Sequence, residues 1–176
     1  MPHPPHSLRL FGRFAGLLLT SWVVMTMTHE LGHIFGGWSG GATLVDADLR
    51  PWHLPYSIHS PDPSPLLTLW SGPIVGVAIP IVAAVIIRWR SAWFVADFCI
   101  LANGTYLALA WLAGDPHLDT SRLLESGASS ISLATYCVLT ISLGYVRFRN
   151  DCVMLLSENQ PTNHSQESES ADTASR

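Results

Sequence analysis

The sequence predicts an all-α membrane protein of about four transmembrane helices, with a Gly- and Pro-rich loop between the first two. Three observations lead to this fold class. Of the 176 residues, 48% are hydrophobic and only 12% are charged, whereas about a quarter of the residues in a soluble domain are charged. The hydrophobic residues are concentrated in long segments that can cross a bilayer. Arginines flank these segments, a pattern typical of multi-pass membrane proteins.

The first expected span covers residues 8–38. Arg9 and Arg13 lie near its start, and residues 14–27 carry no charge. A cleaved secretory signal also begins with basic residues and an apolar stretch, but it ends at a small-residue cleavage site. Here the apolar run continues directly into a polar motif that begins at His29. We therefore expect this segment to remain in the protein as its first transmembrane helix.

Three further spans are expected at residues 66–87, 92–113 and 129–146. At 1.5 Å per residue, a helix of about twenty residues crosses a hydrocarbon core of about 30 Å. Asp97 lies near the start of the third span, and we expect it at the membrane interface.

The positions of the arginines predict the orientation of the spans. If the four spans alternate in direction, the arginines that flank them fall mostly on one side, and only Arg50 and Arg122 fall on the other. The positive-inside rule assigns the arginine-rich side to the cytoplasm. We therefore expect a multi-pass protein of the cell membrane with both termini in the cytoplasm. The arginines on the cytoplasmic side are Arg9, Arg13, Arg88, Arg90, Arg147 and Arg149.

Residues 39–65, between the first two spans, are rich in Gly, Pro and Asp. The repeated prolines exclude a continuous helix there. Gly40 and Gly41, followed by residues 42–45, predict a turn and one short strand. We expect residues 1–150 to form a single membrane domain and residues 151–176 to form a polar, disordered tail.

Two pairs of glycines predict close approach between helices. Gly32 and Gly36 in the first span, and Gly72 and Gly76 in the second, have the GxxxG spacing. Because glycine has no side chain, this spacing lets two helix backbones approach each other closely.

The composition also limits the partners. No basic patch with interleaved aromatic residues is present, so nucleic-acid binding has no support, and the lipid bilayer is the expected surrounding. Cys99, Cys137 and Cys152 show no CxxC spacing, and we expect them to be free thiols.

The residues that carry chemistry are His29-Glu30-Leu31-Gly32-His33, near the C-terminal end of the first span. Two histidines four residues apart share one face of a helix and can bind one Zn²⁺. A glutamate beside the first histidine can take a proton from a water molecule that the metal activates. An HExxH motif at this place predicts a hydrolytic zinc site inside a membrane.

A catalytic zinc site usually has three protein ligands, so one ligand must come from elsewhere. The first and third spans run in the same direction, and their ends therefore lie toward the same membrane face. The segment after the third span contains His117 and two carboxylates, Asp115 and Asp119. Both carboxylates satisfy the requirement for an oxygen ligand, and topology alone does not choose between them.

These motifs resemble the site-2 protease family of intramembrane zinc metalloproteases. In that family a helical HExxH motif is followed by a leucine-aspartate-glycine motif whose aspartate is the third metal ligand. The resemblance covers about residues 20–125 and implies that Asp119 is the third ligand, with Asp115 as the alternative. Its matching segments are His29 to His33, Ser71-Gly72-Pro73, Leu118-Asp119 and Arg122-Leu123-Leu124.

The resemblance implies an intramembrane zinc metalloprotease that hydrolyses peptide bonds of transmembrane protein substrates. Zn²⁺ would be held by His29, His33 and Asp119, and Glu30 would be the general base. The chain departs from the family pattern in two places. Thr120 stands where a glycine is expected, and the nearest upstream asparagine is the distant Asn103.

These departures support one alternative, a non-hydrolytic zinc-binding membrane scaffold or an inactive protease relative. A metal transporter is a weaker alternative, because the second and fourth spans carry almost no polar residues.

Overall fold

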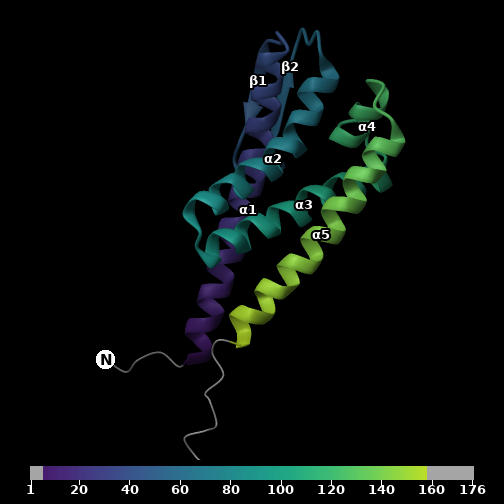
Figure 1. Ribbon diagram of the computed structural model, residues 1–176. Helices are drawn as coiled ribbons and strands as arrows, with labels where there is room; N and C mark the ends of the chain where they lie inside the picture. The colour runs from purple at the N-terminus through teal and green to yellow at the C-terminus, as the bar shows by residue number, and fades with distance from the viewer. Residues whose placement is uncertain (1–5, 158–176) are drawn as a thin grey trace, which may run out of the picture.

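The computed structural model describes residues 6–157 and is helical apart from one β-hairpin (Figure 1). The predicted fold class, an all-α membrane protein with a short sheet between the first two long helices, is confirmed. The elements are α1 (His6–Ser39), β1 (Leu44–Asp48), β2 (Tyr56–His59), α2 (Pro65–Ile87), α3 (Arg90–Ala113), α4 (Asp119–Glu125) and α5 (Ser130–Ser157).

Four of the helices are long and apolar enough to cross a membrane: α1 from Leu8 onward, α2, α3 and α5. Their outer surfaces carry large apolar side chains that no other part of the described chain covers. Ile86, Leu112 and Ile131, for example, are 73%, 85% and 77% exposed. Such surfaces would be costly in water, whereas acyl chains solvate them well. The chain is therefore a multi-pass membrane protein.

The first three spans begin and end within two residues of the predicted positions, but the fourth is longer than predicted. The prediction ended this span at Val146, whereas α5 continues to Ser157 and includes the first residues of the expected tail. Within the added part of α5, the Arg147 Nε donates to the Asp97 Oδ1 of α3 at 2.7 Å, so this arginine is part of the helix and pairs with a neighbouring helix. Asp97 is consequently buried within the bundle, at 2% exposure, and its place at the membrane interface stays a prediction. The rest of the expected tail, residues 158–176, lies outside the described residues.

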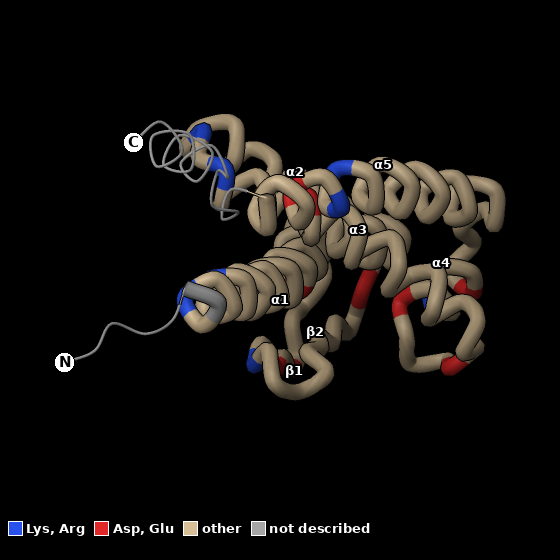
Figure 2. The backbone as a smooth tube through the Cα atoms, turned by 90° about the horizontal axis from the view of Figure 1, so that it is seen from below, with Lys and Arg blue, Asp and Glu red and all other residues tan. Residues whose placement is uncertain are grey.

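Charged residues are distributed unequally along the helices. In the view from below, basic positions lie on α1, on α5 and at the turn between α2 and α3 (Figure 2). Most acidic positions lie around the hairpin and α4 (Figure 2). The two ends of the bundle therefore differ in charge, which is the asymmetry on which the orientation prediction rests.

Helices α1 and α2 pack against each other through glycine, as the GxxxG spacing predicted. A Cβ atom added at Gly32 would lie 2.4 Å from the Ser71 carbonyl oxygen, and one added at Gly72 would lie 2.3 Å from the His33 ring. No larger residue fits at either position without moving a neighbouring group. The close contact brings the His33 ring directly against the backbone of α2.

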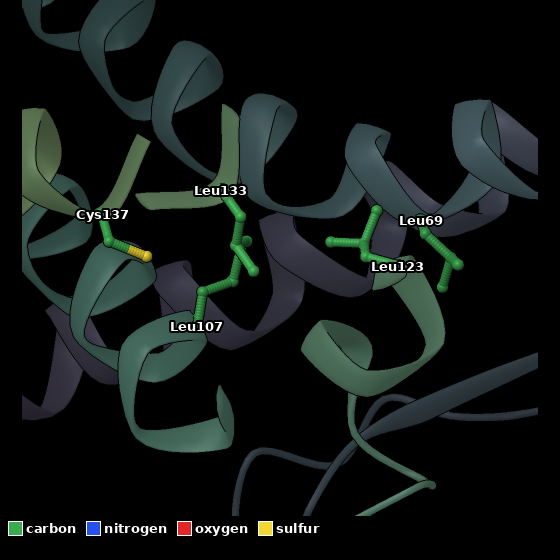
Figure 3. Packing of buried hydrophobic residues seen from close by; sticks show 5 residues of the cluster. All are labelled: Leu69, Leu107, Leu123, Leu133 and Cys137. Atoms are coloured by element: carbon green, nitrogen blue, oxygen red, sulfur yellow. The ribbon is translucent and has the colours of Figure 1, made fainter. Parts of the chain in front are cut away.

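A cluster of buried apolar side chains holds α4 against the long helices (Figure 3). Leu123 of α4 is fully buried among residues of α2, α3 and α5. Because Leu123 lies one helical turn after Asp119, this packing also fixes the position of the Asp119 carboxylate. The cluster contains Leu69, Leu107, Leu123, Leu133 and Cys137.

The loop between α1 and α2 forms an antiparallel hairpin beside α1 (Figure 1). The short strand expected at residues 42–45 is displaced to Leu44–Asp48, and it pairs with a second strand, Tyr56–His59, that lies within the Pro-rich part. Prolines exclude helix there but do not prevent a short strand between them. The three cysteines are free thiols, as expected.

Candidate metal centre

The two motif histidines lie on one face of α1 and are almost completely buried. His29 and His33 are each 4% exposed, and their Nε2 atoms are 3.1 Å apart. The spacing of four residues produces this arrangement directly, because it places both imidazoles above each other on one side of the helix.

Asp119 reaches the histidines from α4. Its Oδ2 atom is 3.0 Å from the His29 Nε2 and 3.3 Å from the His33 Nε2. The chain turns toward the site after α3 ends at Gly114, which adopts a left-handed conformation with φ 64°. Five residues later α4 begins with Asp119 itself.

The structure separates the two candidate carboxylates. Asp115 is exposed, and its Oδ1 accepts a hydrogen bond from the backbone N–H of His117. Asp119 is buried between the histidines, whereas Asp115 lies only on the wall of the adjoining cavity. The geometry therefore brings Asp119, and not Asp115, to the histidine pair.

Thr120, at the position where the family resemblance leads one to expect glycine, has a clear structural role. Its side chain is fully buried, and its Oγ1 donates to the Leu107 carbonyl oxygen of α3 at 2.8 Å. This hydrogen bond ties the first turn of α4 to α3. The substitution therefore does not move Asp119 away from the histidines.

Two hydrogen bonds fix the tautomers of the histidines. The His33 Nδ1 donates to the Thr68 carbonyl oxygen at 2.9 Å. The His29 Nδ1 donates to the Asn103 Oδ1 at 2.7 Å, and the Asn103 Nδ2 in turn donates to the Cys99 carbonyl oxygen. Both Nε2 atoms are thereby left as lone-pair donors that face Asp119.

This donor set fits a zinc ion. Ligand atoms at 2.0–2.1 Å from a tetrahedral zinc lie about 3.3–3.4 Å from one another, and the three atoms here are 3.0–3.3 Å apart. Three lone pairs at this distance repel one another without a cation between them. A proton shared by one histidine and Asp119 would relieve one contact, whereas a divalent cation would relieve all three.

The charge of Asp119 agrees with a role as ligand. Burial raises the pKa of its carboxyl group, but a proton on the adjacent histidines, above all on His33, lowers it more when no metal ion is bound, so that the pKa lies below its usual range. Asp119 is therefore a carboxylate at neutral pH, which is the form that binds metal ions.

Glu30 lies beside the donor set. It is 7% exposed, and one of its oxygens lies within 4.8 Å of the ring nitrogens of His29 and His33. Its Oε2 accepts a hydrogen bond from the Ser57 hydroxyl of β2 at 3.2 Å. The Tyr106 ring packs edge-on against His29 with 5.3 Å between the centroids.

A cavity of about 580 Å³ opens from this group of residues. One wall is the hairpin from Leu54 to His59, and the opposite wall is the segment from Asp115 to Glu125. Four consecutive residues of β2 line it, and Glu30, His33 and Asp119 lie at its surface. The candidate metal centre is therefore open on one side, as a catalytic site requires.

The loop histidines do not join the pair. His59 packs against Gly37 of α1, and both its ring nitrogens lack a hydrogen-bond partner among the described residues. Burial lowers the pKa of His59, so the ring is neutral at physiological pH. His53 lines a smaller hollow near Trp22.

Sequence reasoning missed Ser57, Tyr106 and the backbone acceptor Thr68. In the sequence, Asn103 is only the nearest asparagine upstream of Asp119. The structure places Asn103 between α3 and His29, with both ends of its amide engaged. No sequence motif marks these residues, because each contacts the site through long-range packing.

Comparison with known proteins gives no match among family models, curated proteins or solved structures.

Proposed function

We propose that this chain is an intramembrane zinc metalloprotease that hydrolyses peptide bonds of membrane-spanning protein substrates. The main support is the convergence of the His29 Nε2, the His33 Nε2 and the Asp119 Oδ2 within 3.0–3.3 Å beside the Glu30 carboxylate. The motif resemblance to the site-2 protease family agrees with this arrangement.

His29, His33 and Asp119 would hold the zinc ion. When bound, zinc supplies a Lewis acid that polarises the scissile carbonyl group and lowers the pKa of a water molecule toward about 7. Glu30 accepts a proton from the attacking water molecule while the water oxygen bonds to the carbonyl carbon. Glu30 then transfers this proton to the amide nitrogen, so that the C–N bond breaks and a neutral amine leaves.

The cavity supports a substrate that is extended where it is cut. Strand β2 pairs with β1 along one edge only, and its residues line the cavity. In a membrane, the backbone groups of an unwound substrate need hydrogen-bond partners, and a strand edge offers them. The polar side chains of Asp115, Arg122 and Glu125 on the opposite wall provide a path for water.

The orientation forms part of the proposal. The arginine pattern supports cytoplasmic termini in the cell membrane. Since α1 would then leave the cytoplasm at Arg9 and Arg13, the metal centre near its other end lies toward the extracytoplasmic face. A reporter fused after Ser157 should be cytoplasmic, and an extracytoplasmic signal from it would refute this orientation.

Replacing the general base tests the proposed reaction. Glu30→Gln should abolish cleavage while zinc remains bound, because the amide cannot accept the proton but none of the three zinc ligands is changed. Quantitative membrane proteomics of cells with the wild-type or the Glu30→Gln protein should show a transmembrane protein that accumulates uncut in the mutant. Wild-type processing by Glu30→Gln would contradict the protease and favour the zinc-binding scaffold.

A further inference from the structure

The β-hairpin contacts the motif glutamate directly. The Ser57 Oγ of β2 donates to the Glu30 Oε2 of α1 at 3.2 Å, across 27 residues of sequence. Both residues are buried, at 6% and 7% exposure. Among residues 6–157, Ser57 is the one hydrogen-bond donor to this carboxylate.

A buried carboxylate without a donor is costly and can turn toward whatever polar group is nearest. At this site the nearest alternative is the metal position itself, because a Glu30 oxygen lies within 4.8 Å of both histidine nitrogens. A hydrogen bond to Oε2 holds the carboxylate back from that position. It also leaves the other oxygen free to accept a proton.

We propose that Ser57 is a positioning residue that orients Glu30, so that the hairpin is part of the catalytic apparatus and not a plain connector. This inference rests on the proposed protease function. Ser57 acts through Glu30 and does not itself exchange a proton with the substrate.

Two further contacts hold the hairpin in the position that this role requires. The Trp22 Nε1 donates to the Pro51 carbonyl oxygen at 2.8 Å. At the other end, the His59 ring lies so close to Gly37 that a Cβ atom there would be 2.6 Å from it. Trp22, Glu30 and Gly37 lie at intervals of about two helical turns along one side of α1.

The hairpin is therefore held against α1 at three positions: before Glu30, at Glu30 and after Glu30 along the helix. Displacement of the hairpin from α1 would remove Ser57 from Glu30 together with one wall of the cavity. Glu30 is therefore held in this orientation only while the hairpin is docked on α1.

The kinetic test compares Ser57→Ala with Ser57→Thr and Ser60→Ala in the full-length, zinc-loaded protein. Ser57→Ala should lower kcat by about 10- to 100-fold, the usual loss when a supporting hydrogen bond is removed, with little change in KM or zinc content. Ser57→Thr keeps the hydroxyl and should restore most of kcat. Ser60→Ala makes the same chemical change at an exposed position of the loop and should behave like wild type.

A second measurement needs no catalysis. Hydrogen exchange of the zinc-free, full-length protein in lipid nanodiscs reports how firmly residues 54–59 are held. Ser57→Ala and Glu30→Ala should both increase exchange there, since each removes the same contact, whereas Ser60→Ala should not. Unchanged exchange in α1 would show that the variants are folded.

The outcomes separate the two proposals. A wild-type protein that binds zinc but cleaves no membrane substrate contradicts the protease function, while hydrogen exchange still tests the Ser57 contact. An active wild type with a Ser57→Ala kcat within about twofold of it, or with equal loss in Ser60→Ala, overturns the positioning role. Unchanged hairpin exchange in Ser57→Ala and Glu30→Ala overturns it as well.

Discussion

Two groups of interacting charged and polar residues link different helices, and they are built on opposite principles. In the first, Asp97 of α3 pairs with Arg147 of α5 at 2.7 Å, and Arg147 also lies over the Trp93 ring. In the second, two histidine nitrogens and the Asp119 oxygen face one another at 3.0–3.3 Å. The first group contains its own cation, whereas the second consists of electron-pair donors.

The surroundings of the two groups also differ. The Arg147 side chain that neutralises Asp97 is 41% exposed, so this pair reaches the surface of the bundle. The donor set opens into a cavity of about 580 Å³. A pair that neutralises its own charge needs no further partner, whereas an open set of donors is suited to bind something from outside. Buried charge alone therefore does not identify a functional site in this protein.

The largest expected effect is on zinc binding by the donor set. Asp119→Ala should lose zinc almost completely after dialysis, because two imidazoles alone form a weak site. Asp115→Ala is the matched control and should retain about one zinc per chain by elemental analysis. Zinc retained by Asp119→Ala would show that the carboxylate is not a ligand, and the contrast between the two groups would disappear.

The second-largest expected effect is on the free energy of unfolding and concerns the Asp97–Arg147 pair. Arg147→Met should destabilise the protein by about 1–3 kcal/mol, because the buried Asp97 carboxylate loses its partner, although solvent reaches the 41% exposed Arg147 side chain. The double variant Arg147→Met with Asp97→Leu should recover most of this loss, since neither charge remains. Unfolding in detergent, followed by helical circular dichroism, measures both changes. Zinc loss from folded Arg147→Met protein would show that the two groups are coupled.

The smallest expected effect is on zinc affinity and concerns Asn103, which contacts the candidate ligand His29. Asn103→Ala should weaken zinc binding by about 10- to 100-fold, because the His29 tautomer and ring orientation are no longer fixed. Asn103→Asp keeps an oxygen acceptor for the His29 Nδ1 and should lose less. Competition with a chromophoric zinc chelator gives the affinities. Equal affinities of all three proteins would reduce Asn103 to a link between helices.

The sequence was sufficient to predict the parts of the site that depend on local spacing and on the order of the spans. The histidine pair follows from a four-residue interval on a helix. The meeting of α1 with the segment after α3 follows from alternating spans, and the structure selects Asp119 from the two carboxylates found there.

Other features depend on contacts that no local pattern encodes. The prediction ended α5 before Arg147, and nothing in the sequence indicates that this arginine pairs with Asp97, 50 residues away in α3. Ser57 was missed because its approach to Glu30 requires a hairpin within a Pro-rich loop to form and then to dock on α1. Asn103 was recognised as a polar residue in a span, but its contact with His29 emerges only when three helices pack together.

The distance along the chain between the donors has a consequence for biosynthesis. His29 and Asp119 are separated by 90 residues. When α1 enters the bilayer, the hairpin and the three helices that complete the site, α2, α3 and α4, have not yet been made. On the proposed function, a newly emerging chain cannot cut its neighbours in the translocation machinery, because its donor set is incomplete until α4 has folded back. Hydrolytic competence would thus arrive only with a finished bundle.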